Sequence, residues 1–142
     1  MEHILIDTNV LSYILKNDTR SAYYLPYLSS EKVLAVSFQT VAELYRWAEK
    51  YSWGKTKLNK LESLLKRFVV VPYDNKLARI WAKVVNERER AGKSISYEDA
   101  WIAACALRHS ATLLTHNRKH FEGITGIKII SQPEEGQFLS KK

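Results

Sequence analysis

The chain has 142 residues, 46% of them hydrophobic, which is the length and apolar content of one globular domain. Its 22 Lys and Arg against 15 Asp and Glu give a formal net charge of +7, which favours a polyanionic partner such as nucleic acid. A single cysteine excludes an internal disulfide, and the lack of a signal-like segment or an apolar run of ~18 residues predicts a cytoplasmic protein without a membrane span.

Short β-branched runs alternate with longer segments of helical period, a pattern typical of a mostly parallel sheet covered by helices. It predicts five strands, near residues 3–6, 33–36, 68–72, 111–115 and 127–130. Two helices are predicted between the second and third strands, over residues 40–52 and 56–66, with a break at Trp53 and Gly54. We expect these two helices to form a helical hairpin.

A further amphipathic helix is predicted after Asp74, and it ends at Gly92, a residue favoured just beyond a helix C-terminus. Two tryptophans lie among apolar neighbours at helical spacing and are expected in the core: Trp81 and Trp101. We expect one domain over residues 1–133, followed by a polar tail over residues 134–142.

Three acidic residues stand where a strand gives way to a helix or near the start of a helix: Asp7, Glu43 and Asp99. In a parallel α/β sheet, the carboxyl ends of the strands and the amino ends of the following helices lie along one edge, where ligands usually bind. Carboxylates that meet in one cleft repel one another unless protonation or a cation relieves the repulsion, and Mg²⁺ suits oxygen ligands. The sequence therefore predicts an acidic cluster that binds a divalent metal ion.

Each of these acids also has a structural explanation. Residues 96–99 and 40–43 match the capping-box spacing, in which the acid reaches back to a free backbone N–H. Asp7 could itself cap a helix that begins near Asn9. The shared sheet edge is what favours a common function over three separate caps.

Four segments carry a resemblance to a known family: IDTNVL at residues 6–11, TVAEL at 40–44, DAWIAA at 99–104 and THNRKHF at 115–121. In this order and at these separations they look like a PIN domain, and residues 4–133 resemble the VapC toxins of prokaryotic toxin–antitoxin pairs. The resemblance implies an α/β/α sandwich and a ribonuclease that depends on Mg²⁺ or Mn²⁺. It also implies a homodimer and a cognate VapB-type antitoxin as partners, besides the RNA substrate.

By position, the resemblance implies that the metal-binding and catalytic acids are Asp7, Glu43 and Asp99. Thr8 and Thr115 match positions whose hydroxyls support such a site. The fourth acidic position of many PIN domains falls on Asn117, whose neutral side chain disfavours a tightly held second metal ion. A divalent ion held there can activate a water molecule and neutralise charge on the scissile phosphate.

Basic residues near the acids would reduce their repulsion of an RNA backbone. Three of them follow Asn117 directly: Arg118, Lys119 and His120. They could equally form a solvated charged turn. Residues 43–60 interleave aromatic and basic side chains, including Arg46 and Lys50, and this mixture suits unpaired RNA. We favour packing in the hairpin or a dimer interface for its aromatics and RNA contact for its basic residues.

Two other functions compete with a nuclease. Haloacid-dehalogenase-like phosphatases also place an Asp after the first strand, but their second Asp is Asn9 here and no later Gly-Asp pair occurs. A PIN fold that only binds RNA or protein is supported by Asn117 and opposed by the three carboxylates. Gly92 and Lys93 resemble the end of a P-loop, but the first glycine of that motif would fall on Glu87.

Overall fold

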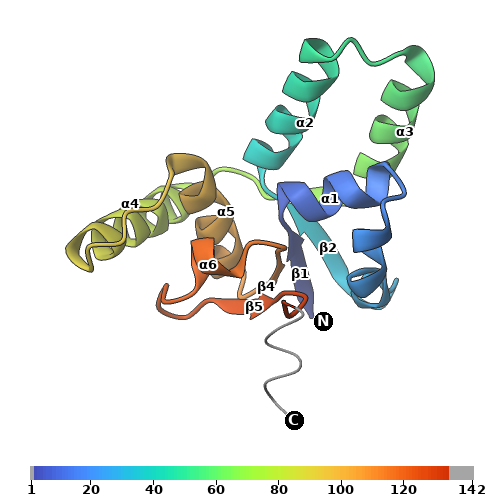
Figure 1. Cartoon of the computed structure of the whole chain (residues 1–142). Coiled ribbons are helices and arrows are strands. Elements are labelled where there is room, and N and C mark those ends of the chain that lie inside the picture. Colours follow the sequence, from blue (N-terminus) through green and yellow to red (C-terminus); the bar gives the residue numbers. More distant parts are fainter. Residues whose placement is uncertain (1, 135–142) are drawn as a thin grey trace.

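The computed structural model describes residues 2–134 and has a five-stranded parallel sheet between layers of helices (Figure 1). The strands are β1 His3–Ile6, β2 Val33–Val36, β3 Val69–Val70, β4 Thr112–Leu114 and β5 Lys128–Ile130. They lie in the order β3-β2-β1-β4-β5, and all four neighbouring pairs are parallel. The predicted α/β/α sandwich is therefore confirmed.

Strand β1 lies at the centre of the sheet, and its sequence explains why. Ile4, Leu5 and Ile6 have no exposed surface, since a strand covered on both faces needs an unbroken apolar run. Their side chains alternate between two core clusters, with Leu5 in one and Ile4 and Ile6 in the other. Helices therefore cover both faces of the sheet.

The helices divide between these two cores. They are α1 Thr8–Leu15, α2 Phe38–Lys50, α3 Lys55–Leu65, α4 Asn75–Arg90, α5 Tyr97–Arg108 and α6 Arg118–Phe121, with short 3-10 turns at η1 Thr19–Tyr23 and η2 Leu25–Tyr27. Helices α4 and α5 pack together on one side. Helices α2 and α3 run in opposite directions away from the sheet, as predicted, and both contact α1 (Figure 1).

Helix α2 begins two residues earlier than its predicted start at residue 40. Ser37 caps it, because the Ser37 hydroxyl accepts a 3.1 Å hydrogen bond from the backbone N–H of Gln39. Thr40 and Glu43 therefore lie inside the helix, and the capping-box interpretation of residues 40–43 is wrong. The carboxylate of Glu43 is not needed as a cap.

Strand β3 is shorter than predicted and forms one edge of the sheet. It pairs with β2 at two residues, and Val71 adds one more backbone hydrogen bond to Val36 at 2.9 Å. Pro72 then has no N–H to donate, so the pairing stops there. Val69 and Val70 are exposed.

Helix α4 ends as the sequence predicts, with Gly92 at a positive φ of 72° just beyond its last turn. None of the helices within residues 2–134 combines the length and the hydropathy that a membrane-spanning helix needs. The expected polar tail at 134–142 lies outside the described residues, apart from Glu134. The domain limit at residue 133 stays a prediction.

Candidate active site

The strand order reverses at the carboxyl ends of β1 and β4. After β1 the chain moves outward to β2 and β3, and it then returns to place β4 on the other side of β1. Such a reversal of strand order opens a crevice beyond the ends of the two central strands, where ligands bind in open α/β sheets. Asp7 follows β1 and Thr115 follows β4 at this point.

Asp7 is the most buried acid of the crevice, at 5% exposure. Its Oδ1 accepts a 2.7 Å hydrogen bond from the backbone N–H of Thr8, and its Oδ2 accepts one of 2.6 Å from the Thr115 hydroxyl. Burial raises the pKa of Asp7 to about 6 despite these donors, and the charges of Asp99 and Glu43 add to the rise. The side chain caps α1, yet it also faces two other acids.

Glu43 is half-buried on α2 and lies close enough to the crevice to interact with its other acids. Burial raises the pKa of Glu43, and the nearby charge of Asp99 adds to this, while a hydrogen bond from the Thr8 hydroxyl opposes it. The Thr8 hydroxyl also lies 2.9 Å from the hydroxyl of Thr40. Thr8 therefore connects the acid on α2 to the start of α1.

Asp99 lies in the first turn of α5. Its backbone N–H donates to the hydroxyl of Ser96, the cap of that helix, at 3.1 Å, which is the serine half of the capping box predicted for residues 96–99. The Asp99 carboxylate contacts α6, because its Oδ2 lies 2.9 Å from Nδ1 of His120. Burial raises the pKa of Asp99, and the charge of His120 is the main opposing influence.

The three predicted acids thus lie in one electrostatic neighbourhood, since Asp99 raises the pKa of both Asp7 and Glu43. Among residues 2–134, no group of three or more His, Cys, Asp or Glu side chains is placed so that it could hold a metal ion together. Mg²⁺ commonly takes only one or two carboxylates and keeps several waters. A site in which Asp7 and one neighbouring acid are the direct ligands would match that pattern.

The backbone of Asn117 is linked to Asp7 by a shared hydrogen-bond partner. Its N–H donates a 3.0 Å hydrogen bond to the Thr115 hydroxyl, the same hydroxyl that donates to Asp7. Its side chain makes no capping bond to α6. The Thr115 hydroxyl therefore connects the backbone of Asn117 to the carboxylate of Asp7.

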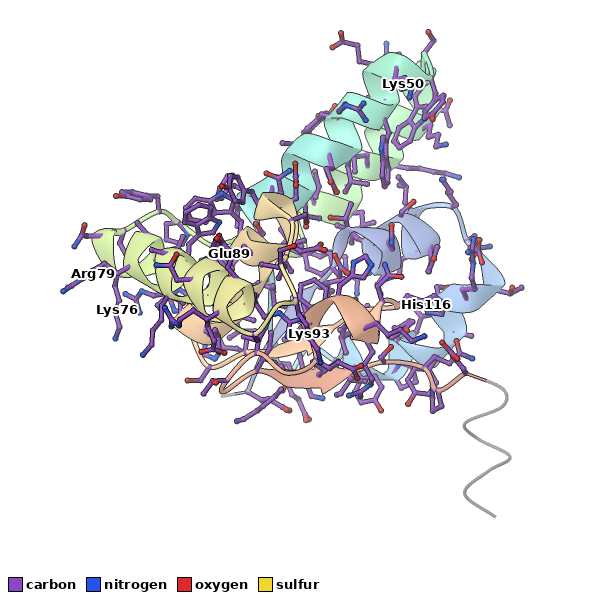
Figure 2. The ribbon with its side chains drawn as sticks, turned by 60° about the vertical axis from the view of Figure 1, so that its left-hand side comes forward. Lys50, Lys76, Arg79, Glu89, Lys93 and His116 are labelled. Carbon is purple, nitrogen blue, oxygen red and sulfur yellow. The ribbon has the colours of Figure 1, made fainter. Side chains whose placement is uncertain are left out.

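The predicted basic residues are divided between two places. Arg118, Lys119 and His120 form the exposed face of α6 beside the crevice. Arg46 lies near enough to Glu43 to lower its pKa. Lys50 lies at the far tip of α2, well away from α6 (Figure 2).

The aromatic residues of the hairpin have two different environments. Trp47 and Trp53 are partly buried against the core that contains Leu44 and Leu61. Tyr45 and Tyr51 are 42% and 64% exposed. Packing within the hairpin therefore explains the tryptophans, while the tyrosines remain at the surface.

Two groups of contacts near the crevice could not be predicted from the sequence. Trp81 and Trp101 pack against the core as expected, but they also stack at 5.0 Å between ring centroids and join Phe38 and Tyr97 at the surface beside Asp99. The hydroxyl of Tyr24, a fully buried residue, lies 2.8 Å from Nδ1 of His116. These partners are separated by up to 92 residues, so no local pattern relates them.

Comparison with known proteins agrees with this geometry. Residues 4–126 match the family model described as PIN domain. The chain is 31% identical over 125 residues to Ribonuclease VapC1 of Haemophilus influenzae (strain R2866), covering 87% of this chain and 93% of that protein. It is 27% identical over 128 residues to the tRNA(fMet)-specific endonuclease VapC of Shigella flexneri, covering 90% and 96%. The structure of VapBC2 from Rickettsia felis bound to a promoter DNA fragment matches with a TM-score of 0.82 at 26% identity, covering 92% of this chain and 99% of that one.

Proposed function

The chain belongs to the PIN-domain family, and on that premise we propose that it is a metal-dependent endoribonuclease and the toxin of a VapBC-type toxin–antitoxin pair. The observation that carries the proposal is the placement of Asp7 at the β1/β4 crevice, in the electrostatic reach of Glu43 and Asp99. The family match removes the basis for a haloacid-dehalogenase-like phosphatase.

The residues that would hold a Mg²⁺ or Mn²⁺ ion are Asp7, Glu43 and Asp99. When bound, the ion would supply positive charge to the scissile phosphate and make an attacking water more acidic. Asp7 is the first choice for direct contact, because a cation would offset the cost of its buried charge. Glu43 and Asp99 would contribute through direct or water-mediated contacts.

The hydroxyl groups hold the acids in position. Thr115 donates to Oδ2 of Asp7 and so favours its ionised form. Thr8 plays the same part for Glu43. With these donors in place, the carboxylates need little rearrangement when substrate and metal ion arrive, which is the benefit of a preorganised site.

His120 connects the acids to the substrate side of the crevice. Its Nδ1 is engaged by Asp99, so Nε2 is the ring nitrogen that can meet the substrate. Arg118 and Lys119 on the same short helix would contact RNA phosphates, and Arg46 would add a contact from α2. These cations would offset the repulsion between the acidic crevice and the RNA backbone.

The partners follow from the family. A VapB-type antitoxin is the proposed inhibitor, since the matched structures include VapBC complexes from Rickettsia felis and Salmonella typhimurium. A homodimer is the proposed assembly. A cytoplasmic location fits both an RNA substrate and such an antitoxin.

The proposal is tested by incubating the purified protein with total cellular RNA and Mg²⁺ or Mn²⁺. We expect discrete fragments that vanish with EDTA and with Asp7→Asn. A folded protein that binds metal but leaves all RNA intact would instead support the second candidate, a PIN module that has lost catalysis, which the neutral Asn117 favours.

A further inference from the structure

A pocket of about 190 Å³ adjoins the acidic crevice. One wall is formed by the loop after β4 and by α6, and it includes His116, Asn117 and Arg118. The opposite wall is formed by the residues that follow β5, including Gln132. Figure 2 shows His116 beside α6.

Two of its lining residues connect the pocket directly to the proposed catalytic acids. The backbone N–H of Asn117 shares the Thr115 hydroxyl with Asp7. His120 forms the 2.9 Å contact with Asp99. A phosphate bound at the acids would therefore have a neighbouring nucleotide at the mouth of the pocket.

The pocket is held open by Tyr24, which is buried behind it. The Tyr24 hydroxyl accepts a 3.1 Å hydrogen bond from the backbone N–H of Gln132 and lies 2.8 Å from Nδ1 of His116. It also donates to the backbone oxygen of Thr115 at 3.2 Å. One side chain thus fixes both walls, so the pocket exists before any ligand arrives.

His116 contributes an aromatic ring to the pocket wall. It lies edge to face against Tyr13 and Tyr24, with centroid distances of 5.3 and 5.9 Å. Burial and the charge of Arg20 lower the pKa of His116, which favours the neutral imidazole. A neutral ring in a fixed orientation suits stacking on a nucleobase.

The charges of the lining favour a base over a phosphate group. The lining includes the carboxylates of Glu122 and Glu134 as well as the cations Arg118 and Lys119, so it is not a purely basic surface. Side-chain amides read the edges of unpaired bases by paired hydrogen bonds, and Asn117 and Gln132 both line the pocket. The volume is below the ~300 Å³ of a typical small-molecule site, which suits one base and excludes a base pair.

We propose that this pocket holds one unpaired nucleotide next to the scissile bond and that Gln132 and Asn117 read its base. The inference rests on the ribonuclease activity proposed above. It adds that this pocket determines which base the enzyme prefers beside the cut. The substrate would be RNA with an unpaired nucleotide at the cut, such as a loop.

The test is cleavage of a random-sequence RNA pool, with the fragment ends sequenced. We expect the natural protein to prefer one base at a single position beside the cut, by about tenfold. Gln132→Ala should reduce this preference to near parity, and Gln132→Glu should change the favoured base, because a carboxylate only accepts hydrogen bonds. Asn86→Ala, an exposed amide on α4, is the matched control and should keep the natural preference. An unchanged preference in both Gln132 variants would overturn the inference.

A binding measurement separates this inference from the ribonuclease proposal. Each of the four nucleoside 5′-monophosphates is titrated into isotope-labelled protein while side-chain amide signals are followed by NMR. We expect one nucleotide to shift the signals of Asn117 and Gln132 and to leave Asn86 unaffected. Shifts without RNA cleavage would support the pocket and count against the nuclease, whereas no shift with any nucleotide would overturn the pocket.

Discussion

The hydroxyl of Thr115 donates a 2.6 Å hydrogen bond to Oδ2 of Asp7 across 108 residues of sequence. This bond is where the ends of the two central strands meet. It is also the donor that most strongly opposes the rise in the pKa of Asp7 caused by burial.

Thr115→Val removes this donor while keeping the shape of the side chain. We expect cleavage to fall about 10- to 100-fold, because one charge-directed hydrogen bond is worth roughly 1.5–3 kcal/mol. The pH at which activity reaches half its maximum should move upward, since the pKa of Asp7 loses its main opposing influence. A pH–rate profile measures both effects, and a profile identical to that of the natural protein would contradict the role of Thr115.

Asp7→Asn should abolish cleavage and stabilise the metal-free fold at pH 7. The pKa of Asp7 is raised from 3.8 to about 6, so the folded state holds its proton more tightly than the unfolded state. The stability that protonated Asp7 adds to the folded state is present below pH 4 and is lost as the pH rises through 6. Removing the buried charge should therefore raise the free energy of unfolding at pH 7 by up to roughly 3 kcal/mol. Urea denaturation with EDTA at pH 4 and pH 7 measures this, and the gain should disappear at pH 4.

Metal binding should stabilise the natural protein and should fail to stabilise Asp7→Asn. A ligand that binds only the folded state adds about 2.7 kcal/mol at 100 times its dissociation constant. Thermal melts with increasing Mg²⁺ or Mn²⁺ follow the effect. Glu62→Gln removes an exposed carboxylate on α3 and should respond like the natural protein. Equal Tm shifts in all three proteins would place the metal ion elsewhere.

Arg118→Ala should weaken RNA binding, whereas Lys50→Ala should not. Arg118 lies on α6 beside the acids, and Lys50 lies at the distant tip of α2 (Figure 2). Losing one phosphate contact lowers the slope of log K against log salt by about one. Binding to RNA in the Asp7→Asn background, measured at several salt concentrations, tests this. If only Lys50→Ala lowers the slope of log K against log salt, RNA binds along the α2–α3 hairpin and not at α6.

Asp74→Asn should reduce stability without changing the chemistry. Asp74 caps α4 through the backbone N–H of Leu77 at 2.8 Å, and its Oδ2 accepts a 2.6 Å hydrogen bond from Arg108 on α5. The hydrogen bonds from Arg108 lower the pKa of Asp74 to about 2. The stability that ionised Asp74 adds to the folded state is therefore present above pH 4 and is lost as the pH falls towards 2. The difference in Tm between the two proteins should shrink over that interval, and cleavage per folded molecule should stay constant.

The sequence predicted the strands and the convergence of the acids because these depend on local pattern and on one rule of topology. Asp7 follows an unbroken apolar run, and the sheet order brings it beside Thr115. The start of α2 differs from the sequence prediction by two residues, because Ser37 and Thr40 both resemble caps and only the backbone decides between them.

Contacts between distant segments cannot be predicted from the local sequence pattern. Tyr24 meets His116, and Asp99 meets His120, only after the chain has folded. Lys50, which the sequence suggests as an RNA contact, is a second residue whose position only the fold gives. It lies seven residues after Glu43, yet the straight axis of α2 carries it away from the acids (Figure 2).

The early end of β3 at Pro72 has a consequence for the behaviour of the protein at high concentration. An exposed sheet edge can recruit a strand from a second molecule and begin an aggregate. Here the edge offers two residues of pairing before proline interrupts it, which is too little to hold an added strand in register. Exposed valines at this edge, Val69 and Val70, can therefore be tolerated without the sheet growing from one molecule to the next.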